Sequence, residues 1–247
     1  MSVAGVVVVH EPTRELERCL AALRPQVEEL VVVANLPGTH AAGVKLIVNE
    51  QPLGYAANAN RGIAATTAPF VVLCNPDTEA APDTIQVLRE FAEAHPRAGI
   101  LGPALTYPHG SVNPSRRRFP TVGGTIVRRT PLRRVLGHTQ CAHYGLDREP
   151  TEPVEADWLL GAFLFLRRQM LDELGGFDEG FRLYGEDIDL AYRAAKADWE
   201  RWYVPAAKAV HAHAAVTDRT LLTRQTLWHW RGIARFVRKH PERLRAR

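Results

Sequence analysis

The sequence predicts an α/β fold, with a Rossmann-like, mostly parallel central sheet flanked by helices and followed by a C-terminal amphipathic helix. Short unbroken apolar runs such as 6–9 and 70–74 are typical of strands that are buried on both faces. Segments with helical spacing alternate with these runs, which indicates βαβ units. The chain has 247 residues, of which 46% are hydrophobic and 23% charged, enough to form a core without disulfides.

The first half of the chain accounts for most of the predicted sheet. Apolar runs predict strands at residues 6–9, 30–33, 45–48, 70–74 and 99–101. Helices are predicted at 13–23, 54–65 and 82–94. We expect Thr13 to cap the first helix, in which Leu16, Leu20 and Leu23 recur at helical spacing.

The second half has weaker periodicity. Residues 103–155 are rich in proline, glycine and arginine and predict a long connection with short elements, a type of segment that is often functional. A strand at 158–166, a helix ending at Gly175-Gly176, a helix at 186–196 and a strand at 202–204 follow. The last predicted element is a helix at 221–239, with an apolar stripe formed by Leu227, Trp230, Ile233 and Val237.

Charge and cysteine content limit the cellular setting. The net charge is only +4, but arginines gather at 116–118, 128–134 and in the tail from Arg235. These clusters indicate a solvated basic surface, contact with diphosphate groups, or an anionic membrane surface. Nucleic acid is not expected, because no aromatic-interleaved basic motif is present. The scattered Cys19, Cys74 and Cys141, the missing signal-peptide pattern and the absence of about 18 consecutive apolar residues favour a cytoplasmic protein.

Polar clusters at the ends of predicted elements suggest chemistry. Asn75-Pro76-Asp77 follows a buried strand, where a carboxylate can hold a divalent metal ion at the carboxyl edge of the sheet. The Glu186-Asp187 pair, with Asp189 nearby, opens a helix and can supply a general base. The pair His211 and His213 follows a later strand and can complete a metal shell, or bind zinc. Turn aspartates and acidic helix starts also occur without function. The order of the clusters favours a metal-assisted transfer enzyme.

The order of these segments resembles glycosyltransferase family 2, which has the GT-A fold, and most of all its bacterial rhamnosyltransferase branch. The matching segments cover most of the chain. In order they are VVVV at 6–9, LERCL at 16–20, Asn49, LGYAANANRGI at 53–63, NPD at 75–77, GP at 102–103, GSV at 110–112, PS at 114–115, WLLGA at 158–162, GGFDE at 175–179, YGEDIDL at 184–190 and VH at 210–211.

The resemblance implies inverting transfer of a sugar, rhamnose in that branch, from a nucleotide-diphosphate sugar to a cell-envelope glycan or lipid-diphosphate-linked acceptor. It also implies a divalent cofactor, Mn²⁺ or Mg²⁺. The expected organisation is a single GT-A domain with a nucleotide-sugar-binding half at 1–102, an acceptor-side half with the catalytic helix at 103–219, and a basic helix at 220–247. We expect peripheral contact with the inner face of the membrane through Arg116 to Arg118 and the tail.

Family roles carry over to particular residues. The resemblance makes Asp77 and His211 the metal contacts and Asp187 the general base, with Glu186 as its closest alternative. The remaining site residues fall into a nucleotide-sugar group and an acceptor-side group. They are Asn35, Gly54, Asn58, Asn60, Asn75 and Asp77 for the donor, and Trp158, Gly161 and Ala162 for the acceptor. Helix capping is the alternative for Gly54 and Asn58, and core packing the alternative for Trp158.

The sequence departs from the family at the nucleotide side. Ala34 stands where the family has a base-contacting aspartate, and Val9 and His10 replace a threonine and a tyrosine. Base recognition then falls to Asn35, His10 or Glu11. The alternative is a degenerate GT-A protein that binds a sugar nucleotide without efficient transfer. A nucleotidyltransferase is a third hypothesis, but it needs a glycine-rich basic loop after the first strand, which residues 10–13 do not supply.

Overall fold

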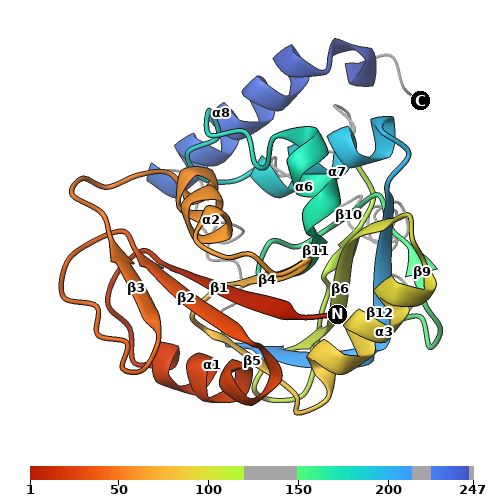
Figure 1. The fold of residues 1–247 in the computed structure, drawn as a ribbon. Helices are drawn as coiled ribbons and strands as arrows, with labels where there is room; N and C mark the ends of the chain where they lie inside the picture. Colours follow the sequence, from red (N-terminus) through yellow and green to blue (C-terminus); the bar gives the residue numbers. More distant parts are fainter. Residues whose placement is uncertain (120–148, 213–223, 245–247) are drawn as a thin grey trace.

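A computed structural model of the chain describes residues 1–119, 149–212 and 224–244. Its centre is a 10-stranded sheet in which eight strands follow the order β3-β2-β1-β4-β11-β6-β12-β5, while β7 pairs with β6 and β9 with β12 (Figure 1). The predicted α/β class is therefore confirmed. The strands are β1 (Val3–Val9), β2 (Glu29–Ala34), β3 (Lys45–Val48), β4 (Phe70–Cys74), β5 (Thr78–Ala80), β6 (Ala98–Thr106), β7 (Val112–Asn113), β9 (Val154–Glu155), β11 (Phe163–Arg167) and β12 (Glu200–His211).

The sheet has a parallel part and a mixed part. Strand β1 is parallel to both β2 and β4, and β3 is parallel to β2. Strand β11 runs antiparallel to its neighbours β4 and β6, whereas β12 is parallel to β6 and antiparallel to β5. A separate two-stranded sheet joins β8 (Arg116–Arg117) to β10 (Trp158–Leu159). The carboxyl ends of β1 and β4 therefore lie at one edge of the sheet, as the βαβ pattern predicts.

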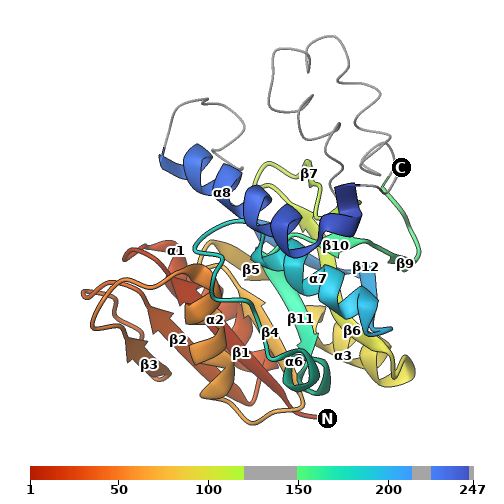
Figure 2. The same cartoon turned by 90° about the horizontal axis from the view of Figure 1, so that it is seen from above.

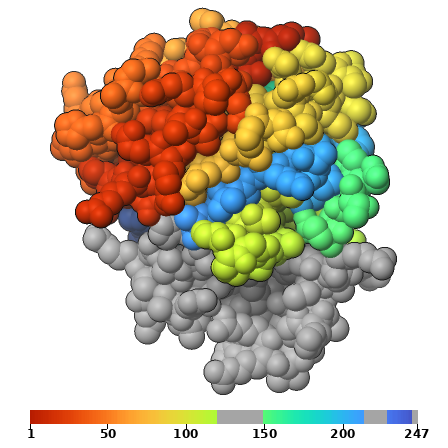
Figure 3. All heavy atoms as spheres, turned by 90° about the horizontal axis from the view of Figure 1, so that it is seen from below, coloured from red at the N-terminus to blue at the C-terminus, as the bar shows by residue number. Residues whose placement is uncertain are grey.

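Helices cover both faces of the sheet, which explains the unbroken apolar runs. Helices α1 (Glu15–Leu23) and α3 (Thr84–Ala94) pack on one face, seen from outside in Figure 3, where the red N-terminal segment lies beside the yellow α3 segment. Helices α2 (Tyr55–Ala64), α6 (Arg168–Leu174) and α7 (Glu186–Lys196) lie on the other face. Side chains of β1 alternate between the two cores, with Val7 and Val9 toward α1, and Val6 and Val8 toward α2.

Several elements differ from the sequence-based expectation. The predicted strand at 158–166 breaks into β10 and β11, because a turn at Leu160 to Ala162 separates them. Strand β12 extends far beyond the predicted residues 202–204. Thr13 does not cap α1: the N-cap residue is Arg14, without a side-chain cap, and the Thr13 hydroxyl contacts Glu15 instead.

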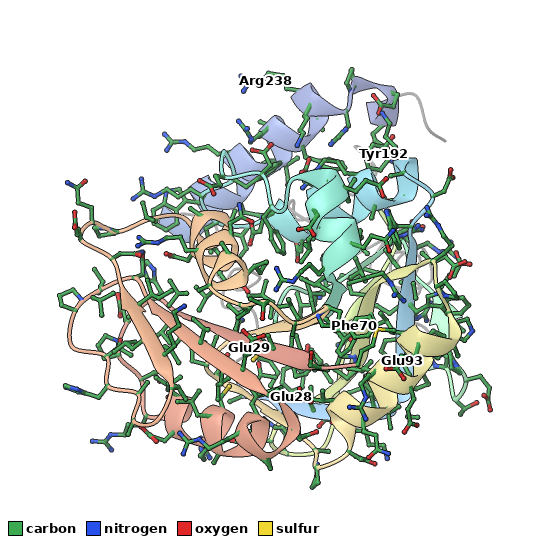
Figure 4. All side chains as sticks on the ribbon, viewed as in Figure 1. Glu28, Glu29, Phe70, Glu93, Tyr192 and Arg238 are labelled. Atoms are coloured by element: carbon green, nitrogen blue, oxygen red, sulfur yellow. The ribbon has the colours of Figure 1, made fainter. Side chains whose placement is uncertain are left out.

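The C-terminal helix α8 (Arg224–Lys239), followed by the short helix η3 (Pro241–Leu244), forms a further layer outside α7 (Figure 2). Buried Phe236 of α8 meets the ring of Tyr192 on α7, and Figure 4 shows Tyr192 below the helix and Arg238 on its outer side. Within the described ranges, no helix combines the length and apolarity needed to span a membrane. The predicted helix start at 221 lies outside the described residues, as do His213, the arginines at 128–134 and Cys141.

Candidate active site

The sheet has a topological switch point between β1 and β4. The chain leaves β1 for β2 and β3 on one side, and then returns to β4 on the other side. In open α/β sheets the crevice outside the carboxyl ends of two such strands is the preferred ligand site. His10 directly follows β1, and the Asn75 to Asp77 turn directly follows β4. Two of the sequence motifs therefore border the same crevice.

The predicted metal contacts Asp77 and His211 lie together. Strand β12 ends beside β5, which pairs His211 with Thr78 and places its Nε2 3.4 Å from Asp77 Oδ2. The backbone N–H of Ala212 also donates to the carbonyl of Asp77 at 2.9 Å. On its other side, the ring of His211 has Nδ1 2.9 Å from the Asn113 side-chain amide, a contact that orients the imidazole.

These two side chains fit a divalent ion that also binds a diphosphate. A carboxylate oxygen and an imidazole nitrogen are suitable ligands for Mn²⁺, and the carboxylate also suits Mg²⁺. No group of three or more His, Cys, Asp or Glu side chains with metal-binding geometry occurs in the described part of the chain. Such an ion would therefore take its remaining ligands from water and from phosphate oxygens, which is the usual arrangement for Mg²⁺ at nucleotide sites.

Asp187 is held by the turn between β10 and β11. Its Oδ2 accepts a hydrogen bond from the Gly161 N–H at 3.1 Å, and its Oδ1 accepts one from the Ile188 N–H at 2.8 Å. A Cβ at position 161 would lie 3.3 Å from the same carboxylate oxygen, so glycine permits the approach. Helix α7 begins here because Gly185 adopts a left-handed conformation with φ 97°.

The neighbouring carboxyl groups have different environments. Glu186 is 7% exposed, and among the described residues its Oε2 has no hydrogen-bond partner. Burial and the nearby Asp187 charge raise the pKa of Glu186 to about 8. Burial also raises the pKa of Asp187, but hydrogen bonds from Gly161 and Ile188 and the positive charge of Arg117 oppose that shift. The hydrogen bonds and Arg117 therefore favour the ionised form at Asp187, whereas the unpartnered, buried Glu186 favours the protonated form.

Tyr55 joins the site although it was not among the predicted site residues. Its hydroxyl donates to the carbonyl of Gly161 at 3.2 Å. Burial raises the pKa of Tyr55 well above its ordinary value, and so do the charges of Glu186, Cys74, Asp187 and Asp77. The phenol is therefore a neutral donor among the site carboxylates. The available signal was its place in the LGYAANANRGI segment, where it is the aromatic residue of an alanine-rich helix.

On the nucleotide side, the structure joins buried asparagines. Asn35 and Asn58 bond to each other at 3.0 Å, and Asn49 bonds to both. Ala34, in the position of the family's aspartate, is fully buried in register between Val9 and Val48. The polar group at the end of β2 is therefore Asn35, as one of the sequence-based alternatives proposed.

Asn60 lies apart from this cluster, and Gly54 contacts it through its backbone, where its carbonyl accepts from the Asn58 N–H at 3.1 Å. Gly54 precedes α2, and a Cβ there would approach the Arg182 backbone to 2.9 Å. Asn60 exchanges two hydrogen bonds with the Phe177 backbone, each 2.9 Å long. On a helix, residues 58 and 60 are about 200° apart, which explains why only Asn58 meets Asn35. Gly54 and Asn60 instead fasten α2 to the loop that leads into α7.

The three predicted acceptor-side residues make different contacts. Trp158 is 8% exposed and packs within the core, with its Nε1–H donating to the Arg118 carbonyl at 2.9 Å and the Arg117 guanidinium over its ring. Gly161 contacts Asp187, as described. The Ala162 carbonyl accepts hydrogen bonds from the Asn75 N–H at 3.0 Å and from the Thr78 hydroxyl at 3.2 Å.

Asp189 was a further candidate for the general base in the sequence analysis, but in the structure its carboxylate is occupied by ion pairs. It is fully buried and bonds to Arg193, Lys239 and His240 at 2.8 to 2.9 Å. Lys239 and Arg235 also bind Asp178. These ion pairs join α8 to α7 and to the loop before it. They also occupy Arg235 and Lys239, which belong to the basic tail that we predicted to contact the membrane.

Comparisons with known proteins identify similar sequences. The sequence model described as glycosyl transferase family 2 matches residues 6–175. An N-acetylglucosaminyl-diphospho-decaprenol L-rhamnosyltransferase of Mycobacterium tuberculosis is 36% identical over 245 residues, which is 87% of this chain and 77% of the relative. The rhamnosyltransferase WbbL of Escherichia coli is 35% identical over 81 residues, 33% of this chain and 30% of the relative.

Solved structures share the fold at low identity. The structure of GalNAc-T7 with UDP, GalNAc and Mn²⁺ superposes with a TM-score of 0.71 at 15% identity, covering 99% of this chain and half (50%) of that chain. The Staphylococcus aureus TarS structure of residues 1–349 superposes with a TM-score of 0.55 at 13% identity, covering 97% of this chain and 74% of that chain. These likenesses support the GT-A fold.

Proposed function

The chain belongs to glycosyltransferase family 2 and is a glycosyltransferase, and from that premise we propose that it transfers a sugar with inversion in a metal-dependent reaction. The proposed donor is a nucleoside-diphosphate sugar, and the proposed acceptor is a hydroxyl group of a lipid-diphosphate-linked glycan. In this reaction the acceptor oxygen bonds to the anomeric carbon, the bond from that carbon to the diphosphate oxygen breaks, and the acceptor proton is transferred to a base.

The turn between β10 and β11 is the observation that carries the proposal. Gly161 donates its N–H to Asp187, and the next residue, Ala162, accepts hydrogen bonds from the Asn75 turn that ends in Asp77. The base side and the diphosphate side of the reaction are thus fixed by adjacent residues. Such fixed placement supports catalysis, because the reacting groups need not be ordered in the transition state.

On the donor side, Asp77 and His211 would hold Mn²⁺ or Mg²⁺, which when bound neutralises the negative charge of the leaving nucleoside diphosphate. Asn113 keeps the His211 ring oriented toward Asp77. On the acceptor side, Asp187 removes the hydroxyl proton, since its hydrogen bonds and Arg117 favour the ionised form. Protonated Glu186 and neutral Tyr55 supply O–H donors beside it.

The relatives and the charge distribution support the finer assignment. The Mycobacterium tuberculosis relative is named for rhamnose transfer to a diphospho-decaprenol-linked sugar, and we propose the same classes of donor sugar and acceptor here. Arg117, which pairs across β8 and β10 with Trp158, lies where it acts on Asp187 and is suited to an acceptor diphosphate. We propose that the protein works at the inner face of the membrane, with the outer side of α8 against the lipid.

Calorimetry with dTDP and UDP, with and without Mn²⁺, tests the donor assignment. Asp77→Asn is expected to weaken binding of the diphosphate and to abolish its dependence on Mn²⁺. Asp172→Asn, on the exposed side of α6, is a matched control that should bind as the natural chain does. Unchanged metal dependence in Asp77→Asn would contradict the assignment. Binding without any transfer of sugar would favour the degenerate alternative.

A further inference from the structure

We propose that His10 is a specificity-determining residue that presents a fixed Nε2–H donor to the nucleobase, and so selects bases that carry a carbonyl oxygen on the contacted edge. The inference rests on the proposed function, because it requires a nucleotide donor in the crevice between β1 and β4. It goes beyond that function by assigning a class of base. A chain of hydrogen bonds leads from Arg61 and Leu53 to His10, and the donor is determined at every step.

The direction is first set at Asn35. The backbone N–H of Leu53, which can only donate, lies 2.7 Å from Asn35 Oδ1. The side-chain amides of Asn49 and Asn58 donate to the same oxygen, each at 3.0 Å. Asn35 Nδ2 therefore points the other way, to His10 Nδ1 at 2.9 Å.

A second group of known polarity confirms this direction. The guanidinium of Arg61 can only donate, and its Nη1 lies 2.7 Å from Asn49 Oδ1. Asn49 Nδ2 must then be the donor to both Asn35 and Asn58. The three asparagines are 1%, 5% and 2% exposed, so reversing any amide would leave buried groups facing like partners.

The direction of these hydrogen bonds determines which ring nitrogen of His10 carries the proton. An amide NH₂ group cannot accept, so His10 Nδ1 accepts from Asn35 and carries no proton. The proton of the neutral ring therefore lies on Nε2. His10 is exposed and directly follows β1, beside the switch-point crevice. A rigid, buried network thus gives an exposed imidazole one defined hydrogen-bonding polarity.

This polarity distinguishes classes of base. Guanine O6 and thymine O4, like the equivalent oxygen of uracil, accept hydrogen bonds, whereas the amino groups of adenine and cytosine at the matching positions donate. An Nε2–H that faces the amino group of adenine or cytosine would meet another donor. Asn35 Oδ1 cannot compensate, because three donors already occupy it.

The tautomer can be measured without any nucleotide. Long-range ¹⁵N–¹H spectra of the full chain, with His10→Phe to identify the signals, are expected to show His10 with Nδ1 unprotonated and Nε2 protonated. In Asn35→Asp, the new carboxylate would accept from Nδ1, and the ring proton should appear on Nδ1. A His10 ring protonated on Nδ1 in the natural chain would overturn the proposal.

The base preference is tested by binding UDP, dTDP, GDP, CDP and ADP in the presence of Mn²⁺. The natural chain should bind the first three about tenfold more tightly than the last two. His10→Phe should remove that preference while retaining binding to all five. His95→Phe, at the opposite edge of the sheet before β6, is the matched control and should keep the preference.

The outcomes separate this inference from the proposed function. Binding of all five diphosphates without preference, or a preference that survives in His10→Phe, overturns the role of His10 and leaves the proposed function intact. Failure of every diphosphate to bind overturns both. If Asn35→Asp does not fold, His10→Phe alone still decides the outcome, because the exposed His10 lies outside the hydrophobic core.

Discussion

Asp187 and Glu186 are adjacent in the chain, yet their surroundings suit them to different roles. Asp187 accepts two backbone hydrogen bonds, whereas Glu186 has a buried oxygen without a partner in the described part of the chain. We expect Asp187→Asn to lower the transfer rate about 100- to 10,000-fold with donor affinity retained, because a base acts in the transition state. Glu186→Gln should retain much more activity. Single-turnover transfer and donor calorimetry on both variants measure this, and the reverse ranking would mean that Glu186 is the base.

The raised pKa of Glu186 predicts a dependence of stability on pH. Between its ordinary value of 4.5 and the folded value of about 8, the folded protein holds a proton that the unfolded chain releases. The free energy of unfolding should therefore fall as pH rises through this window, by an amount on the order of a few kcal/mol. Burial shifts Asp187 in the same direction.

Urea unfolding at pH 5 and pH 9 measures this effect. Glu186→Gln keeps the shape of a protonated glutamate, so its stability should change much less between the two values. Glu17→Gln, on the exposed side of α1, should behave as the natural chain does. An equal loss of stability in the natural chain and Glu186→Gln would show that Glu186 does not hold the proton.

At the level of single residues, the sequence indicated candidate site residues better than it indicated their hydrogen-bond partners. Asp77 closely follows β4, His211 ends β12 and Asp187 lies in the first turn of α7, so the sequence could place each of them at the end of an element. The Asn35 network could not, because its directions depend on donors from Leu53 and Arg61 that only the folded chain brings close. Tyr55 was missed because an aromatic residue at a helix start usually indicates packing.

Among the elements, α8 packs against the turn before α7, the helix that carries Asp187. Gly232 on α8 is buried against the turn before α7, where a Cβ would lie 2.2 Å from the Tyr184 carbonyl oxygen. Tyr184 itself has φ 70° and Gly185 φ 97°, a left-handed pair that directly precedes Glu186. We expect Gly232→Ala to displace α8 and lower turnover by up to about 100-fold, since small misplacements of reacting groups are costly.

Ala234→Gly is the matched control for that variant. Ala234 is exposed on the same helix, and glycine there weakens the helix by about 1 kcal/mol without any steric overlap. Thermal unfolding should show a similar loss for both variants, whereas the transfer rate should fall only in Gly232→Ala. Natural turnover in Gly232→Ala would show that α8 does not position α7.

Element boundaries were predictable where patterns were long. Strands β3 and β4 and helix α7 begin and end as the sequence predicts, because unbroken apolar runs and helical spacing define them. The turn at Leu160 to Ala162 was not predictable, since its break is fixed by partners far along the chain in Asn75 and Asp187. The short strands β5, β7, β8 and β9 were missed because they carry too few residues for a pattern.

For the whole molecule, the structure narrows the proposed membrane contact to particular side chains of α8. Arg235 and Lys239 are engaged by Asp178. Of the α8 side chains that the structure describes, Trp230, Arg231 and Arg238 are exposed large or charged groups without that contact. These positions lie within an arc of about 100° on the helix. We expect flotation with anionic vesicles at low salt and little with neutral vesicles, because each arginine contributes about 1 kcal/mol that salt screens.

Two double variants that each remove two positive charges test which surface makes the contact. The double variant Arg231→Gln with Arg238→Gln should lose the preference for anionic vesicles. The double variant Arg14→Gln with Arg18→Gln, on α1 at the opposite face of the sheet, should keep it. Equal flotation of the two double variants would argue against α8 as the contact surface.

The ion pairs of Asp189 have a consequence for protein synthesis. His240 lies 51 residues after Asp189, so at about 5–20 residues per second the ribosome delivers it roughly 3 to 10 seconds later. During that interval the carboxylate of Asp189 lacks two of its three partners, Lys239 and His240, and burying it would cost several kcal/mol. We therefore expect α7, the helix that carries Asp189, to settle against the sheet only after α8 has been synthesised.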